Sequence, residues 1–216
     1  DVNNSESITT LDLIQLRKLI LSIDTEFANN TSWRFVEAAY VFPNPSNPWA
    51  AAFPEVVNIN NLPATGLASQ DFVAVKIGDV NLDAEVNNLQ DVEDRNTVGA
   101  LAFEVAETNL KAGNEYTVEF TASEIAKVTG YQATLTFNTA AVELVDIIGG
   151  IATEENFGLA YVDEGLITTS WNLGGLRSKG VTEGVMFSLV LRASADANLS
   201  EVLGVSSRIT KAEAYE

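Results

Sequence analysis

The stretch Tyr131-Gln-Ala-Thr-Leu-Thr-Phe137 alternates apolar and polar side chains at every step, which is the two-residue period of a β-strand with one buried face. Residues 101–105 and 116–120 repeat this period. Residues 185–191 form a nearly continuous apolar run with one serine inside it, and they also predict a strand. Short strands of this kind, separated by glycine-containing turns, are typical of an antiparallel β-sandwich. The sequence therefore predicts such a sandwich over residues 98–216.

The N-terminal part of the chain carries a different, helical pattern. Leucine and isoleucine recur at helical spacing over residues 13–23, and we expect this helix to end near Asp24. A second short helix is predicted over residues 68–77, because Gly78 is a typical residue just after a helix end. Candidate cap residues at the start of the first helix are Thr9, Thr10 and Asp12.

The segment between the two predicted helices is rich in proline and aromatic residues. All five prolines of the chain fall within residues 27–66, and proline at this density prevents a regular helix. A polar, acidic segment at residues 84–97 is interpreted as a domain boundary. The predicted fold class is α+β: a small α-helical domain over residues 1–90 with a long proline- and aromatic-rich insertion, then the antiparallel β-sandwich of residues 98–216.

The composition argues against several classes of function. The 216-residue chain has 30 acidic and 12 basic side chains, and its net charge of −18 argues against binding to nucleic acid or to anionic lipid. It contains neither cysteine nor histidine, so it has no disulfide, no thiol nucleophile and no Ser-His-Asp triad. Its apolar runs are shorter than the roughly 20 residues of a membrane-spanning helix. A hard cation held by oxygen ligands is the kind of metal site that stays open.

Oxygen-bearing residues at the N-terminus follow the spacing of an EF-hand-type calcium loop. In Asp1-Val-Asn-Asn-Ser-Glu-Ser-Ile-Thr-Thr-Leu-Asp12 they occupy loop positions 1, 3, 5, 9 and 12, a main-chain carbonyl would fill position 7, and Ile8 takes the place of the apolar anchor. Two departures lower the expected affinity. Serine at position 5 is a weaker ligand than aspartate, and Glu6 stands where glycine normally permits the sharp turn. The predicted ligands are Asp1, Asn3, Ser5, Ser7 and Asp12.

The same opening recurs just before the predicted domain boundary. Asp79-Val-Asn-Leu-Asp-Ala-Glu85 repeats the ligand spacing, with aspartate at position 5 and Val86 at the anchor position. The residue that closes this loop is left open between Gln90, Asp91 and the more distant Asp71. A lone motif of this kind is usually a plain turn, whereas two copies beside short amphipathic helices favour Ca²⁺. The predicted ligands of the second loop are Asp79, Asn81, Asp83 and Glu85.

The first loop and its helix together resemble one repeat of a type I dockerin. The resemblance rests on Asp1-Val-Asn-Asn and on Ile8-Thr-Thr-Leu-Asp-Leu-Ile-Gln-Leu-Arg-Lys-Leu-Ile-Leu21. It extends to residues 67–85, where helix and loop come in the opposite order after a connecting segment far longer than in a dockerin. Dockerins pair a calcium loop with a helix twice and bind a cohesin domain. The resemblance implies that the residues contacting such a partner are Thr10, Leu11, Arg17 and Lys18.

Residues 98–216 resemble a cohesin, the domain that dockerins bind. The combination of both resemblances is similar to the C-terminal region of large surface proteins secreted by Bacteroidota, which implies a location outside the cell or at its surface. Because the chain starts at Asp1 without methionine, we interpret it as a piece of a longer protein whose incomplete last sheet would offer an open edge for strand donation. The stretches that carry the cohesin resemblance are Gly130-Tyr-Gln-Ala-Thr-Leu-Thr-Phe-Asn138, Val142-Glu-Leu-Val145, Ile167-Thr-Thr-Ser-Trp-Asn172 and Gly184-Val-Met-Phe-Ser-Leu-Val-Leu-Arg192.

The first functional hypothesis is a non-catalytic, calcium-stabilised structural or adhesion module that mediates protein–protein association of the cohesin–dockerin type. Its partner would be a cohesin-like or dockerin-like domain, either in the same chain or in a neighbouring one. Head-to-tail contacts between neighbouring chains do not close on themselves and would build a fibre.

The alternative hypothesis is a carbohydrate-binding module of a secreted multidomain enzyme, with a cell-surface glycan as its ligand. Four aromatic residues could stack on a sugar, but we favour their interpretation as a small core of the N-terminal half or as its contact with the sandwich; they are Trp33, Tyr40, Phe42 and Trp49. Acidic residues that could form a glycosidase pair are interpreted instead as exposed loop acids, namely Glu154, Glu155, Asp163 and Glu164.

Overall fold

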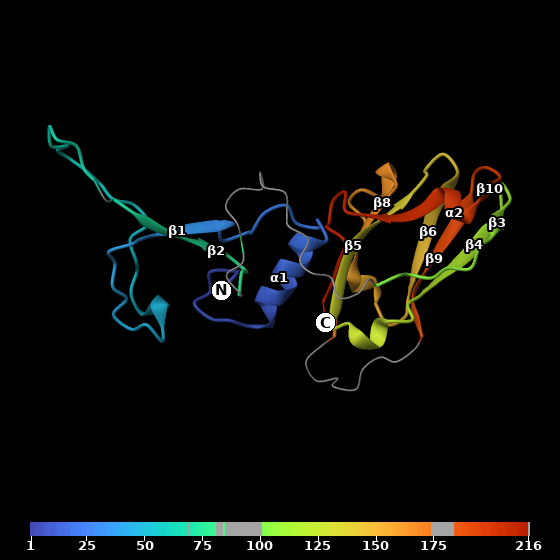
Figure 1. Ribbon diagram of the computed structural model, residues 1–216, viewed down its shortest axis with the longest axis horizontal. Coiled ribbons are helices and arrows are strands. Elements are labelled where there is room, and N and C mark those ends of the chain that lie inside the picture. The colour runs from blue at the N-terminus through green and yellow to red at the C-terminus, as the bar shows by residue number, and fades with distance from the viewer. Residues whose placement is uncertain (69, 81–83, 85–100, 174–183, 216) are drawn as a thin grey trace. The chain divides into compact units, whose positions relative to one another are not determined.

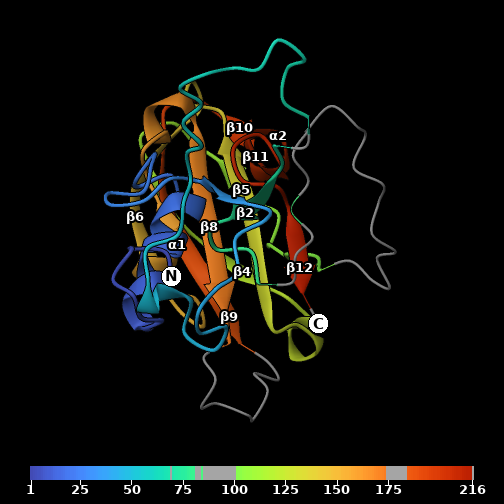
Figure 2. The ribbon, with the colours of Figure 1, turned by 90° about the vertical axis from the view of Figure 1, so that its left-hand side faces the viewer.

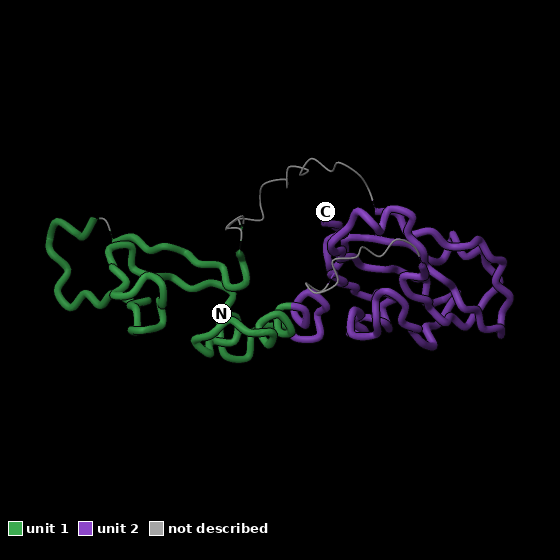
Figure 3. The backbone as a smooth tube through the Cα atoms, turned by 90° about the horizontal axis from the view of Figure 1, so that it is seen from below, with its two compact units in different colours: residues 1–16, 25–93 green, residues 17–24, 94–216 purple. Residues whose placement is uncertain are grey.

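The structure is a computed structural model that describes residues 1–68, 70–80, 84, 101–173 and 184–215. The chain divides into two compact units, shown in different colours in Figure 3. Residues 1–16 and 25–93 form the N-terminal unit, and residues 17–24 and 94–216 form the sandwich unit. The predicted boundary segment at residues 84–97 lies outside the described residues apart from residue 84.

The N-terminal unit contains the start of one helix, a β-hairpin and long connecting loops. Helix α1 (Thr10–Ile20) begins after Thr9, whose hydroxyl accepts a hydrogen bond from the Leu11 N–H at 3.3 Å. In the opposite direction, the carboxylate of Asp12 in the first turn accepts a hydrogen bond from the Thr9 N–H at 2.7 Å. The two bonds cap the helix start in a way similar to a capping box, except that the Thr9 hydroxyl accepts the N–H of Leu11 and not that of Asp12. Thr9 and Asp12 therefore act as cap residues, whereas Thr10 is the first residue of the helix. The hairpin and loops contain β1 (Trp33–Glu37), η1 (Pro48–Ala50) and β2 (Phe72–Lys76), which Figure 1 shows in part.

The prediction of a second helix over residues 68–77 is wrong. Phe72–Lys76 is strand β2 and pairs antiparallel with β1, with Trp33 opposite Lys76. The segment Phe-Val-Ala-Val-Lys is rich in β-branched and aromatic residues, which favour a strand once a partner strand is available. Gly78 does adopt a left-handed conformation at φ 90°, but it follows a strand instead of a helix. The part of the N-terminal unit that the structure describes is therefore not the predicted α-helical domain.

The sandwich unit consists of antiparallel strands in two main sheets. One sheet has the strand order β11-β5-β8-β7, and β12 also pairs with β5; the other has the order β4-β9-β6. A small third pair joins β3 and β10. The elements are β3 (Asn109–Leu110), β4 (Glu115–Thr121), η2 (Ile125–Lys127), β5 (Gly130–Phe137), β6 (Val142–Gly149), η3 (Glu154–Asn156), β7 (Phe157–Gly158), η4 (Val162–Glu164), β8 (Leu166–Asn172), β9 (Val185–Ala193), β10 (Ala197–Asn198), α2 (Leu199–Val202), β11 (Leu203–Ser206) and β12 (Glu213–Tyr215).

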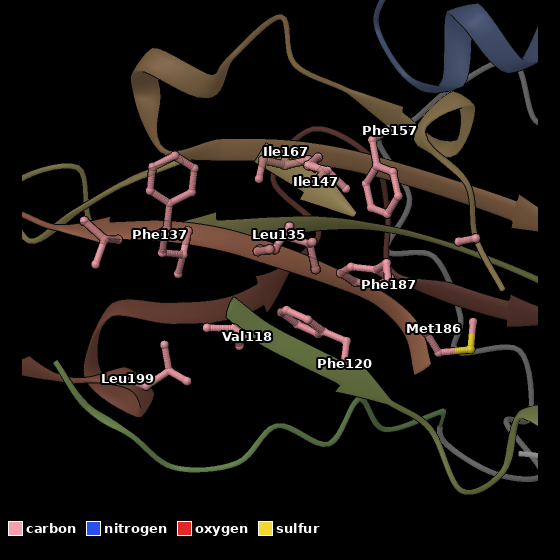
Figure 4. Packing of buried hydrophobic residues seen from close by; sticks show 14 of the residues in the cluster. Val118, Phe120, Leu135, Phe137, Ile147, Phe157, Ile167, Met186, Phe187 and Leu199 are labelled. Carbon is pink, nitrogen blue, oxygen red and sulfur yellow. The ribbon is translucent and has the colours of Figure 1, made fainter. Parts of the chain in front are cut away.

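The core of the sandwich lies between these two sheets. Phe187 of β9 stacks on Phe120 of β4 at 4.4 Å between ring centroids and meets the edge of Phe157 from β7 at 4.9 Å. Leu135 and Ile167 face each other across β5 and β8 and are fully buried. Figure 4 shows these side chains packed together. The alternation of residues 131–137 therefore places one face of β5 in a core, as predicted.

Other strand predictions hold less well. Residues 101–105 form no named strand, because only Glu104 pairs, through an isolated bridge to Thr121. The short strand β12 (Glu213–Tyr215) pairs with one end of β5. β11 (Leu203–Ser206), which the alternation did not indicate, pairs with the other end of β5.

Strand β6 is an outer strand of the three-stranded sheet. Its pairing with β9 is interrupted by a bulge between Leu144 and Asp146. Glu143 and Asp146 are both exposed on this strand. Within the described ranges, none of the helices has the length and apolar character needed to cross a lipid bilayer.

Candidate functional site

The outer face of the β5–β8 sheet, opposite the core, carries a row of small and hydroxyl-bearing residues. Strand pairing places Gly158 beside Thr168, Thr168 beside Thr134, and Thr134 beside Ser206. Directly opposed residues of antiparallel strands share a face, so these four form one row across the sheet; Figure 2 shows β5 and β8 side by side. Thr134 and Thr168 are only 0% and 1% exposed. A polar row buried to this extent must be covered by another part of the protein.

Residues 17–24 supply that cover, and they include the end of helix α1. The helix stops in a Schellman motif: the Ile23 N–H reaches the Lys18 carbonyl at 2.9 Å, and the Ser22 N–H reaches the Leu19 carbonyl at 3.0 Å. Ser22 holds the left-handed conformation that this motif needs, at φ 55°. The helix therefore ends at Ile20, earlier than the predicted end near Asp24.

The Schellman motif leaves two carbonyls of the helix end to be satisfied, and the sandwich satisfies both. The Thr210 hydroxyl donates to the Ile20 carbonyl at 2.8 Å, and the Thr168 hydroxyl donates to the Leu21 carbonyl at 2.7 Å. The last carbonyls of a helix normally find water or a capping group. Here hydroxyl groups of the sandwich act as the capping groups.

Thr134 positions one of these two donors. Its hydroxyl accepts the Thr210 N–H at 2.8 Å and donates to the Thr210 carbonyl at 3.0 Å, and it also accepts the Ile209 N–H at 3.2 Å. Because Thr134 is completely buried, these bonds hold residues 209–210 against β5. The Thr210 hydroxyl is thereby fixed where it meets the helix end.

Apolar packing and close backbone approach complete this contact, which we call the helix-end site. The Leu21 side chain is 1% exposed. A Cβ atom added at Gly158 would lie 2.0 Å from the Leu21 carbonyl oxygen, so only glycine lets the two backbones approach this closely. Arg17 adds a peripheral hydrogen bond to the Asn172 side chain at 2.5 Å. The site therefore contacts main-chain carbonyls and one leucine residue, which are groups that the C-terminal end of a helix presents.

Of the residues that the dockerin resemblance implies as partner contacts, the structure brings one to the helix-end site. Arg17 reaches Asn172, whereas Lys18 points to Asp24 in a 3.9 Å ion pair that is half exposed on both sides. Thr10 and Leu11 lie exposed at the other end of the helix. The sequence analysis missed Gly158, Thr168 and Thr210; two adjacent threonines inside an alternating strand, Thr168 and Thr169, were the available signal.

The predicted calcium loop at the N-terminus is closed around Asp12. One carboxylate oxygen accepts the Val2 N–H at 2.6 Å and the Asn3 N–H at 3.3 Å, and the other accepts the N–H and the hydroxyl of Thr9. These donors, the Thr9 N–H first among them, lower the pKa of the Asp12 carboxyl from 3.8 to about 2, although its burial acts in the opposite direction. Asp12 therefore stays ionised and ties both ends of the loop together.

The first half of the loop turns its oxygens inward. Asp1 accepts the Glu6 N–H at 2.6 Å through one carboxylate oxygen, and Asn3 accepts the Ser5 N–H at 3.1 Å. The other carboxylate oxygen of Asp1 is buried and has no hydrogen-bond partner. The Ser5 hydroxyl lies 3.1 Å from that of Ser7. A buried anionic oxygen without a donor fits a cation ligand, and the surrounding donor set consists of oxygens, as calcium prefers.

The loop differs from the prediction at its apolar anchor, agrees with it at position 6, and carries little negative charge. Ile8, the expected apolar anchor, is 77% exposed, and the buried apolar residue of the loop is Val2 at 3%. Glu6 adopts a left-handed conformation at φ 64°, as expected for the position that normally holds glycine. Among the residues that the structure describes, no three acidic side chains gather into a metal-binding cluster.

The second predicted loop is described only in part. Asp79 accepts the Ala84 N–H at 3.2 Å, which matches the bond from Glu6 to Asp1 in the first loop. The remaining predicted ligands, the anchor position and two closure candidates lie outside the described residues; they are Asn81, Asp83, Glu85, Val86, Gln90 and Asp91. The third closure candidate, Asp71, is exposed, and its main-chain carbonyl accepts the Ala38 N–H at 2.8 Å.

The aromatic residues considered for sugar stacking pack against each other at steep angles. Tyr40 meets Phe42 edge to face at 5.1 Å and 83°, and Phe42 meets Phe53 at 5.7 Å and 60°. Trp33 is covered by the Lys76 ammonium at 5.5 Å. Tyr40, Phe42 and Phe53 therefore do not form a coplanar platform, and Trp49, the remaining candidate, is half-buried in η1. The four acidic residues considered as a glycosidase pair are exposed, in agreement with their interpretation as loop acids, namely Glu154, Glu155, Asp163 and Glu164.

Comparisons with known proteins find cohesins over about half of the chain. The seventh ScaB type I cohesin from Pseudobacteroides cellulosolvens is 19% identical, with 52% of this chain and 82% of that chain covered and a TM-score of 0.38. The sixth cohesin of scaffoldin B from Acetivibrio cellulolyticus, in complex with a dockerin, is 21% identical, with 49% and 82% covered and a TM-score of 0.37. A type I cohesin–dockerin complex from Clostridium thermocellum gives 14% identity, 53% and 92% coverage and a TM-score of 0.37. No family model and no curated protein matches the chain.

Proposed function

We propose that this chain is a non-catalytic protein-association module whose β-sandwich binds the C-terminal end of a helix. The observation that carries the proposal is the capping of the last carbonyls of α1 by the hydroxyls of Thr168 and Thr210. The last carbonyls of an isolated helix need no hydrogen-bond donors from a sheet, because water or the helix's own side chains could satisfy them. The sheet face is instead built as a receptor for a helix end, in the manner of a cohesin–dockerin pair.

The chemistry of the face suits protein recognition better than catalysis. Its hydroxyl groups are occupied with main-chain carbonyls, and Leu21, whose carbonyl accepts one of these bonds, is itself almost completely buried. Helix-on-surface recognition of this kind obtains affinity from a buried apolar anchor and specificity from a few hydrogen bonds. The alternative of glycan binding has less support, since two of the four candidate stacking residues, Tyr40 and Phe42, pack edge to face.

Calcium and an extracellular location form the second part of the proposal. The oxygen donors of the first loop would hold Ca²⁺ through Asp1, Asn3, Ser5 and the Ser7 carbonyl, with Asp12 closing the loop. Few charged ligands and a strained turn at Glu6 imply weak binding, in the range of roughly 10⁻⁴ to 10⁻³ M that extracellular calcium modules show. Such a loop would fill outside cells, where calcium is abundant. Bound calcium would hold the start of the helix whose other end the sandwich binds.

A peptide-binding experiment on the full chain tests the proposed function. Leu21→Asp places an unpaired charge at the buried anchor and should release residues 17–24 from the sheet face. A fluorescent peptide of residues 8–24, held helical by a staple between positions 11 and 15, is then titrated onto this variant and followed by anisotropy. The peptide should bind the Leu21→Asp chain and bind the unaltered chain at least tenfold more weakly, because the face of the latter is already occupied.

The matched control is the same stapled peptide carrying Leu21→Asp, which should not bind either chain. Near-ultraviolet circular dichroism of Trp171, a buried residue of the sandwich core, reports whether the variant is folded. A folded Leu21→Asp chain that fails to bind the unaltered peptide would refute the receptor function.

A further inference from the structure

The helix-end site is occupied by the chain's own residues, although these residues are isolated from the sandwich in sequence. Residues 17–24 belong to the sandwich unit, whereas the segments on both sides of them, residues 1–16 and 25–93, belong to the N-terminal unit. The contact that joins Leu21 to Thr168 spans 147 positions of the chain, and the contact that joins Ile20 to Thr210 spans 190. One short segment of the sandwich unit is therefore separated in sequence from the rest of that unit.

We infer that residues 17–24 are an exchangeable ligand, and that a second copy of this chain can supply them to the sandwich. This inference rests on the proposed function. The contacts of the segment with the sandwich are two hydroxyl-to-carbonyl bonds, one arginine bond and the close approach of Gly158 to the carbonyl of the buried Leu21, with no strand pairing between the segment and the sheet among the described residues. The same set of contacts forms whichever copy the segment comes from. Exchange of an identical element is a low-cost route to association because it requires no new interface.

The segment and the sheet face can each be disabled by a substitution at a different residue. Leu21 belongs to the segment, and its loss disables the ligand without touching the sheet. Gly158 belongs to the sheet, and a side chain there would collide with the Leu21 carbonyl oxygen at 2.0 Å and with the Thr168 hydroxyl at 2.4 Å. A chain with Leu21→Asp keeps its receptor face but has no ligand. A chain with Gly158→Val keeps its ligand but has no receptor face.

Mass action determines which form an unaltered chain adopts. The segment and the face of one chain meet at the high effective concentration of a tethered pair, so the self-occupied form dominates in dilute solution. Exchange becomes favourable when the tethered contact is broken or when copies are concentrated. Reciprocal exchange between two copies would close into a dimer, whereas one-way exchange would extend into an open chain of copies.

A complementation experiment tests the exchange. The Leu21→Asp chain and the Gly158→Val chain are each measured alone by size-exclusion chromatography with light scattering, and then as an equimolar mixture. Each alone should remain at the mass of one 23.2 kDa chain, and the mixture should give a 1:1 complex of twice that mass. The control is the double variant Leu21→Asp/Gly158→Val, which has neither ligand nor face and should not join either single variant.

A second variant of the sheet face repeats the test in case the Gly158→Val chain does not fold. Thr168→Val combined with Thr210→Val removes both hydroxyl donors while keeping the side-chain volume, and it should also fail to bind segments while still donating its own to the Leu21→Asp chain. If folded variants stay monomeric in the mixture while the stapled peptide binds Leu21→Asp, the exchange between copies is wrong and the receptor function stands. If the peptide also fails to bind, the receptor function itself is wrong.

Discussion

The two units of this protein are stabilised in different ways. The sandwich unit encloses a continuous apolar core in which Phe187, Leu189 and Leu191 are all 0% exposed. Among the described residues of the N-terminal unit, only Val2 and Val36 are buried apolar side chains. Burial of apolar surface is the main stabilising contribution to folding, so one unit can support itself and the other needs additional ties.

Those ties in the N-terminal unit are polar. Arg34 forms a two-pronged pair with Glu55 at 2.9 and 2.7 Å and lies over the Phe53 ring at 4.7 Å. Hydrogen bonds to Arg34 accordingly lower the pKa of Glu55. Asn30 holds the start of the predicted calcium loop in place, because its side-chain amide donates hydrogen bonds to the carbonyls of Asp1 and Val2, both at 3.2 Å. A unit held in this way should respond to pH and to metal, whereas the sandwich should respond to changes in its core.

The largest expected effect is therefore a core truncation in the sandwich. Phe187→Ala removes the ring that stacks on Phe120 and should lower the free energy of unfolding by about 3–5 kcal/mol. Phe35→Ala in the N-terminal unit is the matched control, because Phe35 is 48% exposed and loses little contact. Urea denaturation followed by the near-ultraviolet signal of Trp171 measures both. Equal losses of stability in the two variants would contradict the difference between the units.

Acid should act on the N-terminal unit through Asp12. The pKa of Asp12 is about 2 in the folded protein and about 3.9 in an unfolded chain, so ionisation of this carboxyl stabilises the folded form. The contribution of about 2 kcal/mol is fully present above about pH 5 and is lost as the pH falls through 2. Hydrogen exchange of the Leu13 and Leu16 amides in α1, measured across this range, should show it. Asp12→Asn should have lower protection at pH 6 and lose this pH dependence; unchanged dependence in the variant would exclude Asp12 as its source.

Calcium should have a smaller effect on the same unit. At a free concentration ten times its dissociation constant, Ca²⁺ would stabilise the folded loop by about 1.4 kcal/mol. Calorimetric melting in calcium and in excess EDTA measures this difference, and Asp1→Ala, which removes the unpartnered buried oxygen, should abolish it. Identical melting curves of the unaltered chain in the two solutions would remove calcium from the proposal.

The smallest expected effect concerns the turn at Glu6. Because Glu6 sits at φ 64°, Glu6→Gly should relieve backbone strain and raise the stability of the N-terminal unit by about 0.5–1 kcal/mol. Gly66 in the same unit has a φ of 74° with no atom near its missing side chain, so Gly66→Ala is the opposite control and should destabilise by a similar amount through strain alone. Exchange rates of the loop amides compare the two, and a destabilising Glu6→Gly would contradict the strain.

The predictability of the two units from sequence also differs. The strand β5 was predicted because Tyr131, Ala133 and Leu135 all point into one core, and a two-residue period follows directly from such burial. The strand β2 was mistaken for a helix because its residues are exposed, so their pattern records little about packing. Its conformation depends on pairing with β1, which lies about 40 positions earlier and which local sequence does not reveal.

The candidate sites show the same dependence on distance along the chain. The closed loop from Asp1 to Asp12 could be predicted because its proposed ligands and its hydrogen bonds lie within twelve consecutive positions. The helix-end site was missed because Leu21, Gly158 and Thr210 come together only in the folded protein. A buried threonine on the face opposite the core can be recognised as covered only after the sheet register is known.

The bulged outer strand β6 has a consequence for crowded conditions. Copies of a protein that associate at high density can also meet edge to edge and stack their sheets without limit. The bulge between Leu144 and Asp146 interrupts the regular hydrogen-bonding edge that such stacking requires, and the exposed Glu143 and Asp146 add negative charge to this strand. Amyloid-like growth is thereby discouraged along this edge, so that crowded copies remain soluble while selective contacts form elsewhere.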